Sequence, residues 1–166
     1  MDAMGITLVE ATLCYPIRGG KVLLGVKKKK VCKGKWTGYG GSIEKGERPR
    51  IAARRETKEE CGLVIKPKAL EKAAVINFLN PPEHPSFKVH IYLATRWGGR
   101  LAETDEMGPH EWFPIDGLPF AKMMPEDRHW LPRVLGGEKL IGEVWHNARW
   151  EVIGSTFVQV TLFVEK

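Results

Sequence analysis

The sequence predicts an α/β or α+β sandwich, because strand-like runs recur along the whole chain and one segment shows clear helix signals. No internal repeat, low-complexity tract or change of composition divides the 166 residues, so we expect a single domain, residues 1–166. A chain of this length can bury a substantial core. The order of the strands in the sheet does not follow from the sequence.

Seven apolar runs of strand length predict the sheet. Between Lys88 and Thr95, apolar side chains alternate with more polar ones, as in a strand with two unlike faces. The segment Pro16–Gly20 supplies turn residues for a hairpin. The expected strands are Ile6–Tyr15, Lys21–Lys27, Ala73–Leu79, Lys88–Thr95, Glu111–Ile115, Lys139–His146 and Thr156–Val164.

Two helices are expected. The first spans Pro49–Cys61, because proline is tolerated in a first helical turn and Gly62 stands where helices commonly stop. The second spans Glu126–Leu135, and Pro132 inside it should kink or divide it.

The formal net charge of +6 favours a polyanionic partner. The basic residues concentrate in Lys27–Lys35 and Arg48–Lys58, beside acidic ones. A local phosphate-binding site at the entrance of a pocket explains this distribution as well as a nucleic-acid surface does. We expect a small-molecule nucleotide as the ligand, no stable nucleic-acid partner, and a monomer.

Several sequence features favour a cytoplasmic protein that does not contact a membrane. No apolar run approaches the length of about 20 residues that spans a bilayer, and the acidic start Met1–Gly5 does not resemble a signal peptide. Cys14, Cys32 and Cys61 form no CxxC pair, which indicates free thiols in a reducing compartment.

Three glutamates gather on one side of the first helix. At about 100° per residue, Glu56, Glu59 and Glu60 fall within one arc, whereas basic residues dominate the opposite side. If the basic side faces water, the carboxylates point toward the protein body, where like charges repel and burial is costly. Such a cluster needs raised pKa values or a bound cation, and ligands that are all oxygen suit Mg²⁺ or Mn²⁺.

The segment around this helix resembles the Nudix box. In that motif a glycine, five residues, a glutamate and seven residues precede Arg-Glu-U-x-Glu-Glu-x-Gly-U, where U is bulky and apolar, and only Thr57 departs from it. The matching residues are Gly41, Glu47, Arg55, Glu56, Glu59, Glu60, Gly62 and Leu63. The resemblance implies an α/β/α sandwich with a mixed sheet, and a hydrolase that attacks phosphorus with water.

The same resemblance implies roles for individual residues. Arg55 and Glu47 would brace the loop and the helix, and Glu56 and Glu106 are the candidates for the general base. The implied metal ligands are the carbonyl oxygen of Gly41 and the carboxylates of Glu56, Glu59, Glu60 and Glu106.

A narrower resemblance, to the human-type oxidised purine nucleoside triphosphatases, covers nearly the whole chain. It rests on Val22–Lys28, Trp36–Gly41, Asp105–Met107, Trp112–Phe113, Leu118–Asp127 and Trp130. These MutT-like enzymes hydrolyse 8-oxo-dGTP and related damaged nucleotides to the monophosphate and pyrophosphate, and the resemblance implies that activity here. The implied nucleotide-binding residues are Thr12, Lys27, Thr37, Phe78, Met124, Glu126 and Asp127.

The departures from this subfamily cluster where the base would be read. Thr37 replaces an asparagine, Met124 a stacking tryptophan and Glu126 the first of two aspartates, while Val31 and Ile76 stand where phenylalanines are expected. A threonine lacks the paired donor and acceptor of an amide, and methionine covers a base less selectively than an aromatic ring does. The residues therefore leave the preference for oxidised guanine open.

Two alternatives stay open. The altered pocket also fits a Nudix enzyme for a dinucleoside polyphosphate, a nucleoside diphosphate sugar or a 5′-triphosphorylated RNA. The basic composition permits a non-catalytic nucleotide- or RNA-binding module, although a binder has little need for three crowded acids. We expect the five histidines, His146 among them, to be ordinary surface or core residues, and Trp130 to pack in the core.

Overall fold

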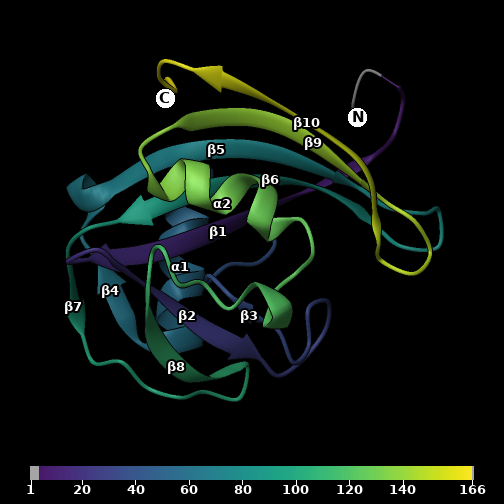
Figure 1. Ribbon diagram of the computed structural model, residues 1–166. Coiled ribbons are helices and arrows are strands. Elements are labelled where there is room, and N and C mark those ends of the chain that lie inside the picture. Colours follow the sequence, from purple (N-terminus) through teal and green to yellow (C-terminus); the bar gives the residue numbers. More distant parts are fainter. Residues whose placement is uncertain (1–3, 166) are drawn as a thin grey trace.

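A mixed sheet of eight strands forms the centre of the molecule (Figure 1). The structure, a computed structural model, describes residues 4–165. Residues 1–3, on which part of the interpretation of Met1–Gly5 rests, lie outside the described residues. The strand order is β10-β9-β5-β6-β1-β2-β3, with β8 also paired to β2. Its strands are β1 (Leu8–Arg18), β2 (Lys21–Lys27), β3 (Trp36–Thr37), β5 (Leu70–Leu79), β6 (Ser86–Ala94), β8 (Met107–Pro114), β9 (Lys139–His146) and β10 (Val152–Val160).

The sheet is mixed because two neighbouring pairs run parallel. These are β1 with β6 and β5 with β9, whereas the remaining pairs are antiparallel. A separate two-stranded ribbon joins β4 (Leu63–Ile65) to β7 (Trp97–Gly99), and short 3-10 turns occur at Pro67–Ala69 and Phe120–Lys122.

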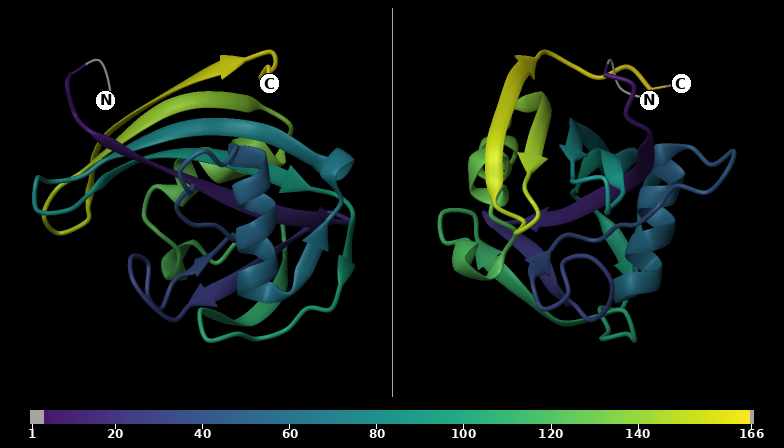
Figure 2. Two further views of the ribbon diagram at one scale, coloured as in Figure 1. Left: turned by 180° about the vertical axis from the view of Figure 1, so that it is seen from behind. Right: turned by 90° about the vertical axis from the view of Figure 1, so that its right-hand side faces the viewer.

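Helices α1 (Pro49–Cys61) and α2 (Asp127–Leu135) cover opposite faces of the sheet, as the right-hand view of Figure 2 shows. Each face therefore has its own apolar core. Trp130, Leu131 and Val134 of α2 pack on one core, and Ala53 and Cys61 of α1 pack on the other. The predicted α/β/α sandwich with a mixed sheet is confirmed. None of the helices in residues 4–165 has the length and apolar content that crossing a bilayer requires.

Helix α1 has the predicted bounds. Pro49 opens the helix, and Gly62 closes it with a φ of 84°, a left-handed conformation that glycine adopts without steric cost. Thr57, the departure from the motif, is fully buried and donates its hydroxyl hydrogen to the carbonyl of Ala53 at 2.7 Å. A polar side chain is thus accommodated at an apolar position, because its hydrogen bond is satisfied within the helix.

The hairpin between β1 and β2 is tighter than predicted. Strand β1 continues to Arg18, and only Gly19 and Gly20 form the turn, with φ of 58° and 75°. Two consecutive residues with positive φ match the twist of the flanking strands, so three residues assigned to the turn belong to the strand instead.

The C-terminal strand was placed four residues too late. It spans Val152–Val160 rather than Thr156–Val164, because the chain reverses directly after β9. The side-chain oxygen of Asn147 accepts hydrogen bonds from the backbone N–H groups of Arg149 and Glu151, and this starts the hairpin at once.

Two further details of the elements differ from the sequence analysis. Pro132, which was expected to kink or divide the second helix, does not divide it, and α2 is one helix from Asp127 to Leu135. Pro132 has no N–H to donate to the carbonyl of Arg128, but Arg128 is exposed, so water can replace the missing donor. Strands β3, β4 and β7 were not predicted, because runs of two or three residues are too short to show an alternating pattern.

Candidate active site

The loop before α1 is fastened to the helix by a fork of hydrogen bonds. The Arg55 guanidinium donates from Nε to Glu47 Oε2 at 2.8 Å and from Nη2 to Glu47 Oε1 at 2.9 Å. Its Nη1 donates to Glu56 Oε1 at 2.9 Å. The paired geometry matches the planar guanidinium to the carboxylate, so Arg55 holds both the loop and the neighbouring Glu56 in place.

Two glycines allow this loop to approach the sheet and the helix closely. A Cβ atom at Gly40 would overlap the backbone carbonyl of Thr12 on β1, and one at Gly41 would lie 2.6 Å from the Glu56 carboxyl carbon. The Gly40 N–H donates to Glu60 Oε1 at 2.7 Å. The loop therefore lies directly against the acidic side of α1, where only glycine leaves enough space.

Three acids converge at this point: Glu56, Glu60 and Glu106. One carboxylate oxygen from each lies within 4.8 Å of the others, a spacing that allows a single metal ion to contact all three. Glu106 arrives from the loop before β8, which is tied to the end of β2 by the hydrogen bond from Lys28 N–H to the Glu106 carbonyl at 2.9 Å. Three carboxylates are a ligand set for a hard divalent cation.

The environment of Glu56 and Glu60 disfavours their negative charge. Burial, with a smaller contribution from the nearby Glu56 and Glu106, raises the pKa of Glu60 to about 8 against the opposing effects of Lys27 and the Gly40 N–H. Burial also raises the pKa of Glu56, whereas its contact with Arg55 lowers it. A divalent cation would reverse this balance by favouring the ionised carboxylates, so the site has the charge and the ligand atoms that such an ion needs.

The expectation that all three helix glutamates point inward holds for Glu56 and Glu60 but was wrong for Glu59. The Glu59 side chain is 49% exposed and lies 3.3 Å from the Arg55 guanidinium, at the rim of the acidic cluster. The carbonyl of Gly41 accepts a hydrogen bond from the Thr12 N–H at 2.9 Å, which leaves one lone pair for another contact. Both residues border the cluster, but the structure groups neither with the three converging carboxylates.

A cavity with a volume of about 180 Å³ adjoins the acidic cluster. Lys27, Gly40 and Gly41 border both the cavity and the surface that carries the acids. The Lys27 ammonium lies 3.9 Å from Glu60 Oε2, at the junction of the two spaces.

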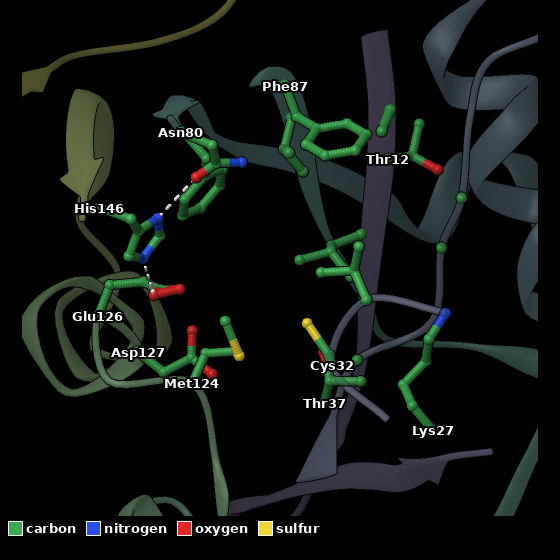
Figure 3. Close-up of a pocket in the computed structure, with 18 of the residues that line it drawn as sticks. Thr12, Lys27, Cys32, Thr37, Asn80, Phe87, Met124, Glu126, Asp127 and His146 are labelled. Atoms are coloured by element: carbon green, nitrogen blue, oxygen red, sulfur yellow. Dashed lines mark hydrogen bonds and ion pairs between the residues drawn. The ribbon is translucent and has the colours of Figure 1, made fainter. Parts of the chain in front are cut away.

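All the residues predicted to bind a nucleotide line this cavity: Thr12, Lys27, Thr37, Phe78, Met124, Glu126 and Asp127 (Figure 3). Val31 also borders the cavity, whereas Ile76, expected at a comparable position, is fully buried in the core. The Thr12 hydroxyl is buried and has no hydrogen-bond partner within residues 4–165, so a polar group at the cavity wall is left unsatisfied.

Two adjacent acids form the far end of the cavity. Glu126 is 3% exposed and Asp127 is 6% exposed, where α2 begins. Burial raises the pKa of Asp127 well above its usual range, and the neighbouring Glu126 adds to the shift. Burial thus favours the neutral form of Asp127, which can donate a hydrogen bond as well as accept one.

Sequence reasoning missed several residues of the cavity. His146, which was interpreted as an ordinary histidine, lines one side of the cavity beside Asn80 (Figure 3). Trp150, from the turn between β9 and β10, also lines the cavity. Trp130 is buried as predicted but also lines the cavity. The alternation in Lys139–His146 was an available signal, because it places His146 on the same face as the buried Leu140 and Val144.

Comparison with known proteins identifies the family. The NUDIX domain matches residues 7–134, a range that contains the glycine loop, α1 and all three converging acids. The chain belongs to the Nudix family. This Nudix protein is 41% identical over 131 residues to a protein named oxidized purine nucleoside triphosphate hydrolase from Danio rerio, in an alignment that covers 79% of this chain and 82% of the relative. The protein of the same name from Mus musculus is 37% identical over 131 residues, with the same coverage.

Solved structures agree on the fold. A MutT protein from Bacillus halodurans superposes on the Nudix chain with a TM-score of 0.76, over 90% of this chain and 97% of that one, at 23% identity. A UDP-X diphosphatase superposes with a TM-score of 0.64, over 79% of this chain and 64% of that one, at 20% identity. At these identities the likeness concerns the fold alone, and it confirms the predicted architecture.

Proposed function

We propose that this chain is a magnesium-dependent nucleoside triphosphate pyrophosphohydrolase that acts on oxidised purine nucleotides and releases the monophosphate and pyrophosphate. The supporting observation is that the cluster of Glu56, Glu60 and Glu106 adjoins a cavity that is lined by two buried acids, Glu126 and Asp127. A triphosphate at the acids and a base between Met124 and Asp127 would fill both parts. The names of the relatives from Danio rerio and Mus musculus point the same way.

The acids would hold the metal. Glu56, Glu60 and Glu106 supply the converging oxygens, Glu59 lies at the outer edge, and the Gly41 carbonyl has a lone pair to spare. When bound, a divalent cation neutralises charge on phosphate oxygens. Mn²⁺ accepts the same oxygen ligands as Mg²⁺.

The chain's own side chains would position the reacting groups. Lys27, at the junction of acids and cavity, attracts the phosphates. Water attacks a phosphorus atom, the bond to the bridging oxygen breaks, and a carboxylate accepts the proton of the water. Glu56 is held by Arg55, whereas Glu106 is exposed and reached directly by water, so we assign the general base to Glu106 with Glu56 as the alternative.

A basic groove next to the cavity favours one second candidate, a 5′-triphosphorylated RNA. The groove shares Val31, Cys32, Met124 and Trp150 with the cavity. Its cationic residues are Lys30, Lys33, Lys35, Arg128 and Arg149. A nucleotide that follows the one in the cavity would place its phosphate beside these charges.

The test is a substrate panel with Mg²⁺ that contains dGTP, 8-oxo-dGTP, dATP, 2-oxo-dATP, a dinucleoside polyphosphate, a nucleoside diphosphate sugar and a 5′-triphosphorylated RNA. We expect the highest kcat/KM for an oxidised purine nucleotide, with the monophosphate and pyrophosphate as products. Faster turnover of the RNA would support the second candidate. Equal turnover of dGTP and 8-oxo-dGTP would remove the claim of selectivity but not that of hydrolysis.

The metal site is tested by Glu60→Gln, which removes the charge at nearly constant shape. We expect kcat to fall about 100-fold or more, because the variant loses a buried ligand to the ion. Glu71→Gln is the matched control, since Glu71 is exposed and pairs with Lys139 far from the cluster. Full activity of Glu60→Gln would contradict the assignment of the metal site.

A further inference from the structure

The His146 ring is held in one position on the side of the cavity. Its side chain is 2% exposed, it stacks on Phe78 with an interplanar angle of 10°, and it packs at 62° against the Trp150 ring with the ring centroids 5.6 Å apart. Both ring nitrogens have partners. Nδ1 lies 2.9 Å from Asn80 Oδ1, and Nε2 lies 2.9 Å from Glu126 Oε2 (Figure 3).

The hydrogen bonds of Asn80 determine which nitrogen of His146 carries a proton. Asn80 Nδ2 donates to the carbonyl of Pro85 at 2.8 Å, and this orients the amide so that its oxygen faces the histidine. An amide oxygen only accepts hydrogen bonds. Therefore His146 Nδ1 carries a hydrogen and donates it to Asn80.

One proton must then lie between His146 Nε2 and Glu126 Oε2, because two lone pairs at 2.9 Å would repel each other. It belongs either to an imidazolium that faces a carboxylate or to a carboxylic acid that faces a neutral imidazole. In both arrangements the other oxygen of Glu126, Oε1, carries no proton. Figure 3 shows that this oxygen lies on the side of the cavity.

We propose that His146 is a positioning residue that makes Glu126 Oε1 an obligate hydrogen-bond acceptor, so that the pocket takes a purine only if the base places an N–H group at that point. This inference rests on the proposed function, because it names the feature of the substrate that the same cavity selects. The adjacent Asp127 is also buried and lines the cavity beside this acceptor.

The pocket should therefore discriminate between two purines with exchanged substituents. A 2-amino-6-oxopurine and a 6-amino-2-oxopurine interchange N–H and C=O groups at positions 2 and 6. Whichever of these positions meets Glu126, only one of the two bases offers a hydrogen there. We expect the deoxynucleoside monophosphates of the two bases to differ in Kd by about tenfold or more, because the mismatched base leaves a buried acceptor unpaired.

The first experiment compares the wild type with His146→Phe. Phenylalanine keeps an aromatic ring between Phe78 and Trp150, but it cannot hold the shared proton. Glu126 then becomes a buried acid whose proton can lie on either oxygen, so the ratio of the two Kd values should fall about tenfold or more toward one. His84→Phe is the matched control, because His84 contacts Trp150 but is exposed and does not touch Glu126.

A second experiment separates this role from simple packing. In Glu126→Gln the amide nitrogen can donate to His146 Nε2, which leaves the amide oxygen facing the cavity, so the wild-type preference between the bases should persist. In the double variant Glu126→Gln with His146→Phe the amide is free to turn over, and the preference should be lost. If His146 only filled space, the two changes would act independently.

Binding is measured by calorimetry with the monophosphates, which requires no turnover, and the melting temperature of each variant reports on folding. The inference is overturned if the wild type binds both bases equally, or if His146→Phe is folded and keeps the full preference. Failure to bind or hydrolyse any purine nucleotide would instead overturn the proposed function. If the wild type hydrolyses purine nucleotides but its preference between the bases does not depend on His146, the proposed function stands and only this inference is removed.

Discussion

Glu60 shows how far the surroundings change a single side chain. In the sequence it is one of three similar glutamates on a charged helix, but in the structure it is 1% exposed and accepts a hydrogen bond from the Gly40 N–H. Glu59, the residue before it, is half exposed beside Arg55. The difference arises because α1 presents only one edge of its acidic arc to the glycine loop, so neighbours in the sequence experience opposite environments.

At the scale of this residue we expect a dependence of stability on pH. The folded protein holds the Glu60 proton up to about pH 8, whereas the unfolded chain releases it near the ordinary pKa of 4.5. The native state thus binds more protons between these values, and the free energy of unfolding should fall across this window as the pH rises. The measurement is urea unfolding in a buffer that contains a chelator, repeated at intervals of about half a pH unit from about pH 5 to about pH 8.

Glu60→Gln isolates this contribution. Burial lowers the pKa values of His90 and His110, and these groups destabilise the folded protein as the pH falls, which opposes the effect of Glu60 in the total. We therefore expect the variant to gain stability relative to the wild type as the pH rises, and Mg²⁺ to offset that gain by stabilising the ionised wild-type site. A constant difference between the two proteins from low to high pH would show that Glu60 titrates normally.

At the scale of elements, the site is a loop and a helix that must meet closely. The Arg55–Glu47 fork draws the loop onto α1, and the absence of side chains at Gly40 and Gly41 lets it reach both β1 and the Glu56 carboxylate. The motif spacing therefore has a physical reason. The residues between the glycine and the glutamates are the ones that the chain needs to leave the loop and enter α1. With this spacing, the glutamates on one face of the helix lie beside the glycine.

Gly41→Ala tests this contact between elements. The added Cβ atom would lie 2.6 Å from the Glu56 carboxyl carbon, so the carboxylate must move away from the cluster. We expect the apparent Mg²⁺ affinity in the activity assay to weaken about tenfold or more, because the orientation of the ligands determines metal binding. Ser42→Ala is the control, since Ser42 is exposed and precedes the same helix. Equal loss in both variants would point to a general disturbance of the loop.

At the scale of the whole molecule, the sheet brings distant segments to one cavity. The acids come from α1 and the loop before β8, the far wall comes from the start of α2, and His146 comes from β9. The parallel pairing of β5 with β9 places Phe78 opposite Val144, two residues before His146. Core packing that keeps these strands together is therefore a condition for the site.

Ile91→Ala tests that condition. Ile91 is fully buried at the centre of β6, between β1 and β5, so its truncation leaves a cavity in the core. We expect a loss of about 2–5 kcal/mol in the free energy of unfolding, measured with urea. Ile153→Ala on β10 removes the same atoms from a side chain that is 66% exposed, and it should change stability by less than about 0.5 kcal/mol. Similar losses in the two variants would be inconsistent with the described core.

Local patterns alone determined the elements with strong signals of their own. Helix α1 was predicted with its bounds because Pro49 and Gly62 restrict the backbone at its two ends, and β9 was predicted with its bounds from an apolar run of strand length. The motif around Gly41 also predicted the family and the acids of α1. Turn lengths were less predictable, since the choice between Gly19–Gly20 and a longer turn depends on strand pairing.

The tertiary structure decided how residues far apart in the sequence share protons and charge. The alternation in β9 places His146 on the buried face, but it does not indicate the role of the ring. That role depends on Asn80 and Glu126, which reach His146 only through the packing of β5, β9 and α2. In the same way, the sequence determined that three acids lie along α1, but only the fold decided that Glu60 is buried, that Glu59 is not, and that Glu106 completes the cluster. Burial and long-range proximity set the pKa values and hydrogen-bond roles, and both are properties of the folded chain.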